Sequence, residues 1–234
     1  METMDLEQLA EYLRRDVREL EKLASRGSLP GRKVNGVWRF AKAEIHHWLS
    51  TRLHEMTQAE LRGIEVAQTC EVPEPLLGNL LRPECVAVPL MANTRPSVLR
   101  ELVRLAEASY LVYDEQALLA ALQQREEMAS TALPGGVAIP HPHRPLGPAV
   151  LGDCLVAFGR TPRGIGYGDP GGERTDLFFL VACTSDQTHL RVLARLGRLF
   201  QSEGFLEQLR QAEDPLAART LLLEAESKLL SSTN

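Results

Sequence analysis

Hydrophobic residues in the N-terminal part of the chain predict short helices arranged around a hairpin. Apolar side chains recur at helical spacing over residues 6–13, 17–24 and 43–53. Between the last two segments, β-prone residues flank Asn35-Gly36. This pair favours a two-residue type I′ turn, because both turn positions need a positive φ. The pattern therefore predicts a small helical unit that carries a β-hairpin.

Beyond residue 75 the pattern changes to helices that alternate with strands. Helical spacing of apolar residues occurs over 96–108, 114–125 and 189–200, and two further helices close the chain. Apolar runs over 154–158 and 177–183 predict strands. This alternation predicts an α/β fold class for the C-terminal part.

The strongest break in the chain lies between these two parts. Residues 57–68 fit a short helix, but Pro73 and Pro75 favour an extended connector after it. We therefore predict an N-terminal domain over 1–54, a linker over 55–75 and a C-terminal domain over 76–231.

Composition and charge narrow the class of protein. The 234 residues are 44% hydrophobic and 24% charged, which suffices for a packed core. The apolar run 177–183 is far shorter than the roughly 20 residues that span a bilayer, so we predict no membrane insertion. The N-terminus is acidic and polar and has no secretory signal, so we predict a cytoplasmic protein.

The cysteines and the charge distribution add two further expectations. None of the four cysteines forms a CxxC pair or a zinc-like cluster with histidine, so we interpret them as reduced thiols and predict no metal or cofactor. Residues 1–54 carry ten cations against eight acids, a net charge of about +2, and the remainder is about −7 against a total of −5. A mildly basic part attached to an acidic part indicates two modules with different partners.

The N-terminal domain resembles the excisionase/MerR-like helix-turn-helix family. The matching residues are Leu9-Ala10-Glu11-Tyr12-Leu13, Gly27-x-Leu29-Pro30, Gly36-x-Trp38-Arg39-Phe40 and Trp48-Leu49. The resemblance implies DNA binding. The second helix is expected to present Arg14, Arg15, Arg18 and Lys22 to a duplex, and the wing to offer Arg32 and Lys33 to phosphates. A protein-binding module with solvated charges is the alternative. One such domain offers few phosphate contacts, so a homodimer is expected for useful DNA affinity.

Candidate chemistry lies in the loop that contains Ile139-Pro140-His141. A neutral histidine is a good nucleophile near pH 7. If His141 attacks a phosphoryl group, the product is a labile phosphoramidate that can be passed on. Such a transfer needs alignment and donors or cations around the moving oxygens, and His189 and Arg125 are candidates to supply them. The alternative is a structural or merely exposed histidine.

Residues 76–231 resemble the enzyme IIA domain of the fructose/mannitol type of the bacterial phosphotransferase system, including its nitrogen-regulatory branch. The matching residues are Arg125-Glu126, Ser130-Thr131, Gly136-x-Ala138-Ile139-Pro140-His141, Asp176-Leu177-x-Phe179-Leu180-Val181-Ala182 and His189-Leu190-x-x-Leu193-Ala194. The resemblance implies a mixed sheet flanked by helices. It also implies that His141 accepts a phosphoryl group from the small histidine phosphocarrier protein.

The resemblance assigns roles to three further residues. His189 would be the second active-site histidine, Arg125 an active-site arginine and Thr131 a hydrogen-bond donor ahead of the loop. The alternatives are a helix histidine on a core face, a helix-end cation and a buried capping hydroxyl. Pro142 departs from the glycine that many members have after the reactive histidine, and it removes one N–H donor. The neighbouring His143 either compensates, competes as an acceptor or points to solvent.

Three functions follow as hypotheses. In the preferred one, the C-terminal domain senses the phosphorylation state of the carrier and modulates the DNA-binding domain. In the second, it relays phosphate to a sugar permease component. In the third, it is a non-catalytic interaction protein with the IIA shape.

Overall fold

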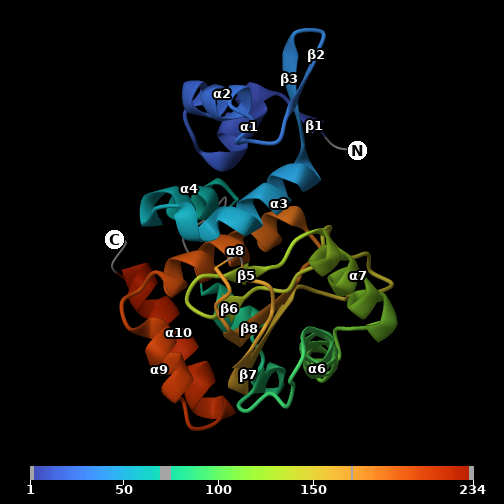
Figure 1. The fold of residues 1–234 in the computed structure, drawn as a ribbon, viewed down its shortest axis with the longest axis vertical. Coiled ribbons are helices and arrows are strands. Elements are labelled where there is room, and N and C mark those ends of the chain that lie inside the picture. Colours follow the sequence, from blue (N-terminus) through green and yellow to red (C-terminus); the bar gives the residue numbers. More distant parts are fainter. Residues whose placement is uncertain (1–2, 69–74, 170, 232–234) are drawn as a thin grey trace.

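The computed structural model, which describes residues 3–68, 75–169 and 171–231, shows a small N-terminal head above a larger α/β body (Figure 1). We call residues 3–53 the head and residues 75–231 the body. The head contains β1 (Thr3–Met4), α1 (Leu6–Leu13), α2 (Val17–Ser25), β2 (Arg32–Val34), β3 (Val37–Ala41) and α3 (Lys42–Arg52). Its last residue begins the 3₁₀ helix η1 (Leu53–Glu55), which leads to α4. Helix α4 (Gln58–Ala67) lies between head and body.

Polar caps and a tight turn define the head, as the sequence predicts. The Asp5 side chain caps α1 in a capping box with Gln8, and Asp16 caps α2 through the N–H groups of Arg18 and Glu19. Asn35 and Gly36 have φ values of 51° and 81°, so the hairpin closes in the left-handed region that a type I′ turn requires. The three strands form one antiparallel sheet in the order β1-β3-β2.

The body is built around a five-stranded mixed sheet in the order β4-β7-β8-β6-β5. Strands β7 and β8 form its long antiparallel centre, while β4 and β6 run parallel to their neighbours β7 and β8. The elements of the body are α5 (Leu76–Leu80), the 3₁₀ helix η2 (Pro83–Cys85), β4 (Val86–Ala87), α6 (Arg95–Glu107), α7 (Glu115–Met128), β5 (Ala132–Leu133), β6 (Val137–Ala138), β7 (Leu155–Ile165), β8 (Thr175–Ala182), α8 (Asp186–Phe200), α9 (Phe205–Gln211) and α10 (Pro215–Ser231). The predicted mixed sheet flanked by helices is confirmed.

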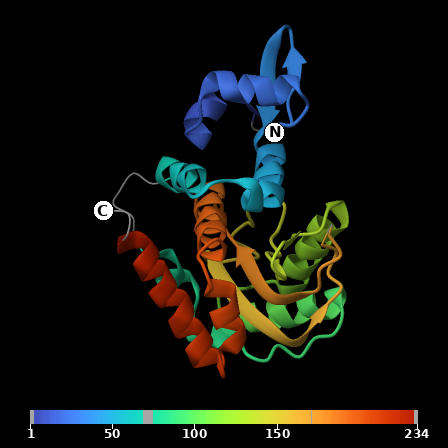
Figure 2. The same cartoon turned by 60° about the vertical axis from the view of Figure 1, so that its left-hand side comes forward.

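Helices cover both faces of the sheet, which explains the continuous apolar runs of β7 and β8. Alternate residues of these strands belong to two separate apolar clusters. One cluster includes α6 and α7, and the other includes α8, α9 and α10 and continues into the head. Figure 2 shows α9 and α10 on the opposite side of the sheet from α6 and α7. Within the described ranges, no helix has both the length and the apolar character needed to cross a bilayer.

Part of the predicted linker is ordered as α4, which packs along α8. Four buried charged side chains join these helices to α10. The pairs are Arg195–Glu65 at 2.6 Å, Arg198–Glu65 at 2.5 Å and Arg195–Glu226. Removing one member would leave an opposite charge buried, so we infer that α4 is firmly held on the body. The rest of the predicted connector, 69–74, lies outside the described residues, and the domain boundaries stay predictions.

Candidate active site

Two histidine rings from different elements meet at the end of the sheet that faces the head. His141 follows β6 in a loop held by two backbone hydrogen bonds. Ile139 N–H donates to the Thr131 carbonyl at 3.1 Å, and Val181 N–H donates to the Pro140 carbonyl at 2.9 Å. His189 lies in the first turn of α8, after the Ser185 cap. The centroids of the two rings are 5.1 Å apart, so the structure brings together the two predicted active-site histidines.

The His141 ring has a defined tautomer. Its Nδ1 lies 2.7 Å from the Ile139 carbonyl, which can only accept, so the Nδ1–H donates and Nε2 keeps its lone pair. The side chain is buried, at 3% exposure. Burial, with the charges of His189 and Arg125, holds the pKa of His141 well below its ordinary value of 6.5. The ring is therefore a neutral nucleophile near pH 7.

His189 is also neutral at this pH. Burial is the main cause that lowers the pKa of His189 from 6.5 to about 3, and the adjacent His46 contributes. Two neutral imidazoles can lie 5.1 Å apart without the repulsion that two charged rings would suffer. An incoming anion would favour the protonated form of either ring.

Arg125 supplies a buried positive charge to this site. It lies in the last turn of α7 and has 0% exposure. Nη1 donates to the Ala129 carbonyl at 2.8 Å and Nη2 donates to the Ser50 hydroxyl at 3.0 Å, while Nε has no partner. Neither acceptor carries a charge. The site therefore holds a guanidinium that is suited to an anion.

The Thr131 hydroxyl, which was expected to donate a hydrogen bond at the site, is engaged elsewhere in the structure. Thr131 Oγ1 is bound to the buried Glu126 carboxylate, which also accepts from the Tyr167 hydroxyl at 3.1 Å and from Arg95 at 2.5 Å. Its backbone carbonyl, however, holds the His141 loop through Ile139. The structure therefore supports a positioning contribution from Thr131 through its backbone and matches the buried-hydroxyl alternative for its side chain.

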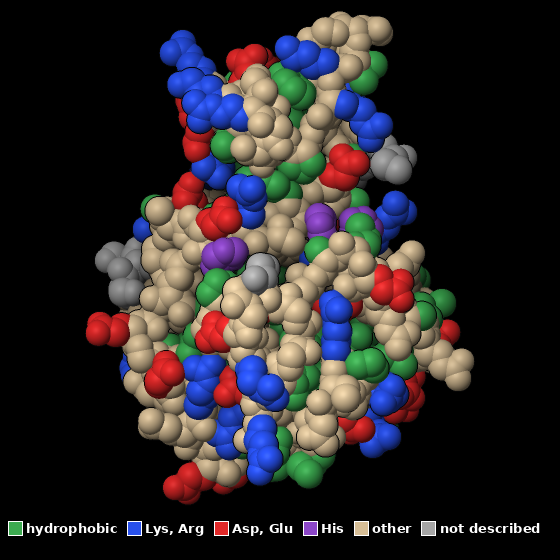
Figure 3. All heavy atoms as spheres, in the orientation of Figure 1, with side chains coloured by type: hydrophobic (Ala, Val, Ile, Leu, Met, Phe, Trp, Pro, Cys, Tyr) green, Lys and Arg blue, Asp and Glu red, His purple; other side chains and the backbone are tan. Residues whose placement is uncertain are grey.

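Helix α3 lies between the rest of the head and the body (Figure 1). The His46 ring lies 6.1 Å from His189, and the His47 ring lies 6.3 Å from His143. Together with the Arg125–Ser50 bond, these contacts place three α3 side chains at the end of the body that carries the two histidines. Five of the six histidines of the chain thus gather at the junction, where Figure 3 shows the histidine side chains. Sequence reasoning missed these covering side chains of α3, although the adjacent pair His46-His47 in a predicted helix was a signal.

A polar clamp fastens α3 to the first turn of α8. Asp186 lies 3.1 Å from His46 Nδ1 and 3.3 Å from Lys42 Nζ. The hydrogen bond from His46 lowers the pKa of Asp186 against the opposing effect of burial. The other ring nitrogen of His46, Nε2, lies 2.8 Å from the Tyr12 hydroxyl. Helix α1, α3 and α8 are therefore connected through one imidazole.

The predicted DNA-contacting residues lie on the head, but not all on the expected helix. Arg18 and Lys22 are exposed on α2, and Arg32 and Lys33 are exposed on β2 of the wing. The placement of Arg14 and Arg15 on the second helix is wrong. Arg14 is the C-cap of α1 with a φ of 50°, and Arg15 precedes the Asp16 cap of α2. Arg15 also pairs with Glu19 and, at 2.7 Å, with Glu60 of α4. The free cationic surface is therefore smaller than predicted.

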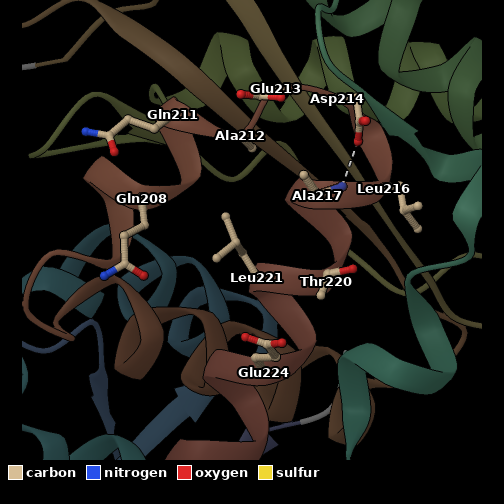
Figure 4. A pocket seen from close by; sticks show the side chains of 10 residues that line it. All are labelled: Gln208, Gln211, Ala212, Glu213, Asp214, Leu216, Ala217, Thr220, Leu221 and Glu224. Atoms are coloured by element: carbon tan, nitrogen blue, oxygen red, sulfur yellow. Dashed lines mark hydrogen bonds between the residues drawn. The ribbon is translucent and has the colours of Figure 1, made fainter.

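A pocket away from the two histidines offers fewer reactive side chains. One of about 660 Å³ lies between α9 and α10, where Figure 4 shows Gln208, Leu221 and Glu224. Its one dashed contact is Asp214 accepting from the Ala217 N–H at 2.8 Å, which caps α10. Across the residues that the structure describes, no group of three or more His, Cys, Asp or Glu side chains is placed to hold a metal.

Comparison with known proteins agrees with this geometry. Residues 79–225 match the family described as "Phosphoenolpyruvate-dependent sugar phosphotransferase system, EIIA 2", and residues 3–53 match a helix-turn-helix domain family. A nitrogen regulatory protein of Bradyrhizobium diazoefficiens is 33% identical over 147 residues, which are 62% of this chain and 92% of that protein. The fructose-specific EIIABC component of Bacillus subtilis is 31% identical over 137 residues, 58% of this chain but 21% of that protein.

Solved structures show the same fold for the body. The nitrogen regulatory protein IIA-Ntr of Neisseria meningitidis aligns with a TM-score of 0.53 and 26% identity, over 60% of this chain and 94% of that one. Escherichia coli IIA mannitol aligns with a TM-score of 0.53 and 20% identity, over 60% and 97%. Fold and site thus define a IIA-type domain that follows a helix-turn-helix domain. The chain belongs to the type 2 EIIA family of the phosphotransferase system.

Proposed function

We propose that His141 accepts a phosphoryl group from the phosphohistidine of a small phosphocarrier, and that this event controls the DNA-binding head. One observation carries the proposal: a neutral nucleophilic ring lies beside a second ring and a buried guanidinium, directly under a helix of the head. The contact of α3 with the surroundings of this ring supports a link between chemistry there and the position of the head.

The transfer needs little beyond alignment. The Nε2 lone pair of His141 attacks phosphorus, and the bond from phosphorus to the carrier's ring nitrogen breaks, with its electron pair going to that nitrogen. The Ile139 carbonyl, which accepts the Nδ1–H, stabilises the positive charge that then develops on the His141 ring. The positive charge of Arg125 stabilises the negative charge on the phosphoryl oxygens, and His189 lies where its ring can donate a hydrogen bond to them.

We infer that the contact between α3 and the body hinders transfer. In-line attack requires the carrier's ring and the phosphorus to approach Nε2, yet His141 is only 3% exposed. Phosphorylation also adds about −1.5 to −2 charges beside the His189 ring, on the helix whose first turn carries Asp186. We therefore propose that the docked head represents the unphosphorylated state and that α3 leaves the site when His141 is phosphorylated.

The surface of separation follows from the contacts of α4. This helix is joined to the body by buried ion pairs, and its polar contacts to the head include the Arg15–Glu60 pair and the Gln68 amide donating to the Tyr12 carbonyl at 2.9 Å. We propose that the head moves as a unit relative to α4 and the body, and that the hinge is η1, which connects α3 to α4. Helix α2 and the wing strands β2 and β3 lie at the end of the head that is far from the body (Figure 1). The movement therefore acts on DNA through the relative orientation of two heads in a dimer.

The experiment measures transfer of labelled phosphate from the phosphorylated carrier to the full chain. Wild type and the control His54→Ala, which changes an exposed histidine of η1, should be labelled, and His141→Ala should not. Label retained in His141→Ala would overturn the acceptor assignment. DNA affinity, measured with a selected operator before and after labelling, should change in wild type and not in His141→Ala. Equal affinities in wild type would overturn the coupling.

The relay hypothesis remains the second candidate, because the Bacillus subtilis relative is named as a fructose-specific EIIABC component. Its prediction differs in one respect. A relay passes the label from His141 to a permease component, whereas the proposed regulator keeps it until the carrier takes it back.

A further inference from the structure

Two cysteines face each other across the central strands of the body. Leu155 of β7 pairs with Ala182 of β8, so Cys154 and Cys183 are opposite each other one position further out. On β8, the Val181 N–H points to the Pro140 carbonyl and the Cys183 carbonyl accepts from the Leu146 N–H, both away from β7. Cys154–Cys183 is therefore a non-hydrogen-bonded pair, the class in which opposite Cα atoms approach to about 4.5 Å. That separation lies within the range of disulfides, about 4.4–6.8 Å.

Both thiols point to the same face of the sheet. Cys154 and Cys183 belong to the apolar cluster that includes α8, with exposures of 6% and 3%. The Thr184 N–H donates to Cys154 Sγ at 3.4 Å, and the Thr184 hydroxyl lies 3.6 Å from the same sulfur. The hydrogen bond with the Cys183 thiol is the largest effect on the pKa of Cys154. Together with the smaller effects of the Thr184 groups, it lowers this pKa to about 5, although burial alone would raise it. A sulfur with several donors and a thiol partner is prepared to act as a thiolate nucleophile.

We propose that Cys154 and Cys183 form a dithiol–disulfide site that is oxidised by a small hydroperoxide. The Cys154 thiolate attacks one peroxide oxygen, the O–O bond breaks, and the leaving hydroxide takes a proton to become water. The Cys183 sulfur then attacks the Cys154 sulfenic acid, the S–O bond breaks, and a second water leaves. Two thiols and one hydrogen peroxide thus give one disulfide and two waters.

The location favours a small oxidant. Both side chains are buried, but Asp153 and Thr184, their chain neighbours at the end of the sheet, are exposed. A molecule close to the size of water needs little opening to reach Cys154 there. Cys85 provides the contrast: it is 0% exposed, and burial raises its pKa to about 11, so it is expected to stay inert.

The site lies directly before α8, the helix that carries His189 and Asp186. Cys183 is separated from the Ser185 cap by Thr184 alone, and Thr184 loses the thiolate as an acceptor when the disulfide forms. Oxidation therefore changes the hydrogen bonding of the segment that leads into the phosphoryl-acceptor site. The inference does not depend on the proposed function.

The test is intact-mass analysis of the full chain carrying Cys70→Ser, after exposure to hydrogen peroxide. The expected product has lost two hydrogen atoms, regains them with dithiothreitol, and yields a peptide that joins Cys154 to Cys183. Adding Cys85→Ser should leave this result unchanged, whereas Cys154→Ser should abolish it. If the Cys154→Ser variant fails to fold, peptide mapping of the oxidised protein that retains both cysteines shows whether Cys154 and Cys183 are joined.

Two results would overturn the site. One is an unchanged protein mass after treatment with hydrogen peroxide, when free glutathione in the same tube, as a control for the oxidant, has been oxidised. The other is a product in which oxygen atoms have been added, or chains have been joined, without an internal bond between Cys154 and Cys183.

Discussion

Replacing Ser50 by arginine is expected to release α3 from the active site. The Ser50 hydroxyl lies 3.0 Å from Arg125 Nη2 and is buried, so Ser50→Arg places a second guanidinium against the first. Two unit charges about 4 Å apart repel by roughly 4 kcal/mol at the effective dielectric constant of about 20 that suits such sites. Since about 1.4 kcal/mol corresponds to a tenfold change in equilibrium, the docked state should lose about a thousandfold relative to the undocked state.

The assay is the initial rate at which the phosphorylated carrier labels His141. If the docked head excludes the carrier, this rate is proportional to the undocked fraction, so Ser50→Arg should label at least tenfold faster than wild type. The control is Thr51→Arg, which adds the same charge to the same helix at a half-buried position whose hydroxyl donates to the His47 carbonyl at 3.2 Å and not toward Arg125. An unchanged or lower labelling rate in Ser50→Arg, with the body still folded by its cooperative unfolding, would refute the reasoning.

Three further predictions concern stability and DNA. Glu65→Gln leaves two buried guanidinium groups without this carboxylate, so urea unfolding should show a loss of about 3–5 kcal/mol, while the exposed Glu224→Gln should change less than about 0.5 kcal/mol. The pKa of His189 is about 3 when folded and ordinarily 6.5, so the unfolded chain binds more protons between these values. Stability should therefore be lost as pH falls below 6.5, by up to about 1.4 kcal/mol per pH unit from this group, and an equally steep loss in His189→Gln would contradict the assignment. Arg18→Ala with Lys33→Ala should reduce the slope of log K against log salt for operator binding by about 2 for each bound head, and an unchanged slope would exclude both as phosphate contacts.

Local patterns were sufficient to predict most elements of the fold. The Asn35-Gly36 turn and the helices of both parts depend on interactions between residues close in sequence, and the structure has them where the spacing of apolar residues places them. The error at Arg14 and Arg15 has a local cause as well. The αL cap at Arg14 ends α1 one residue after the last apolar position, and only the Asp16 cap decides that α2 begins at Val17.

The candidate site was predictable in part only, because its parts differ in how they are encoded. The His141 loop and the His189 helix carry motifs that a resemblance can reveal. The placement of His46 and Ser50 depends on how two domains pack, and no spacing rule connects residues 46 and 189. The Cys154–Cys183 pairing likewise depends on strand register, which the apolar runs did not determine.

The retention of α4 on the body sets the kinetics of any reversal. Only the short segment that contains η1 separates the head from α4. A head that has left His141 therefore stays tethered close to that residue. Its effective concentration at the site is then on the order of millimolar, independent of how much protein a cell contains. Under the proposed function, loss of the phosphoryl group would therefore be followed by closure within one molecule, without a search through solution, and the docked state would return as fast as the phosphoramidate bond is broken.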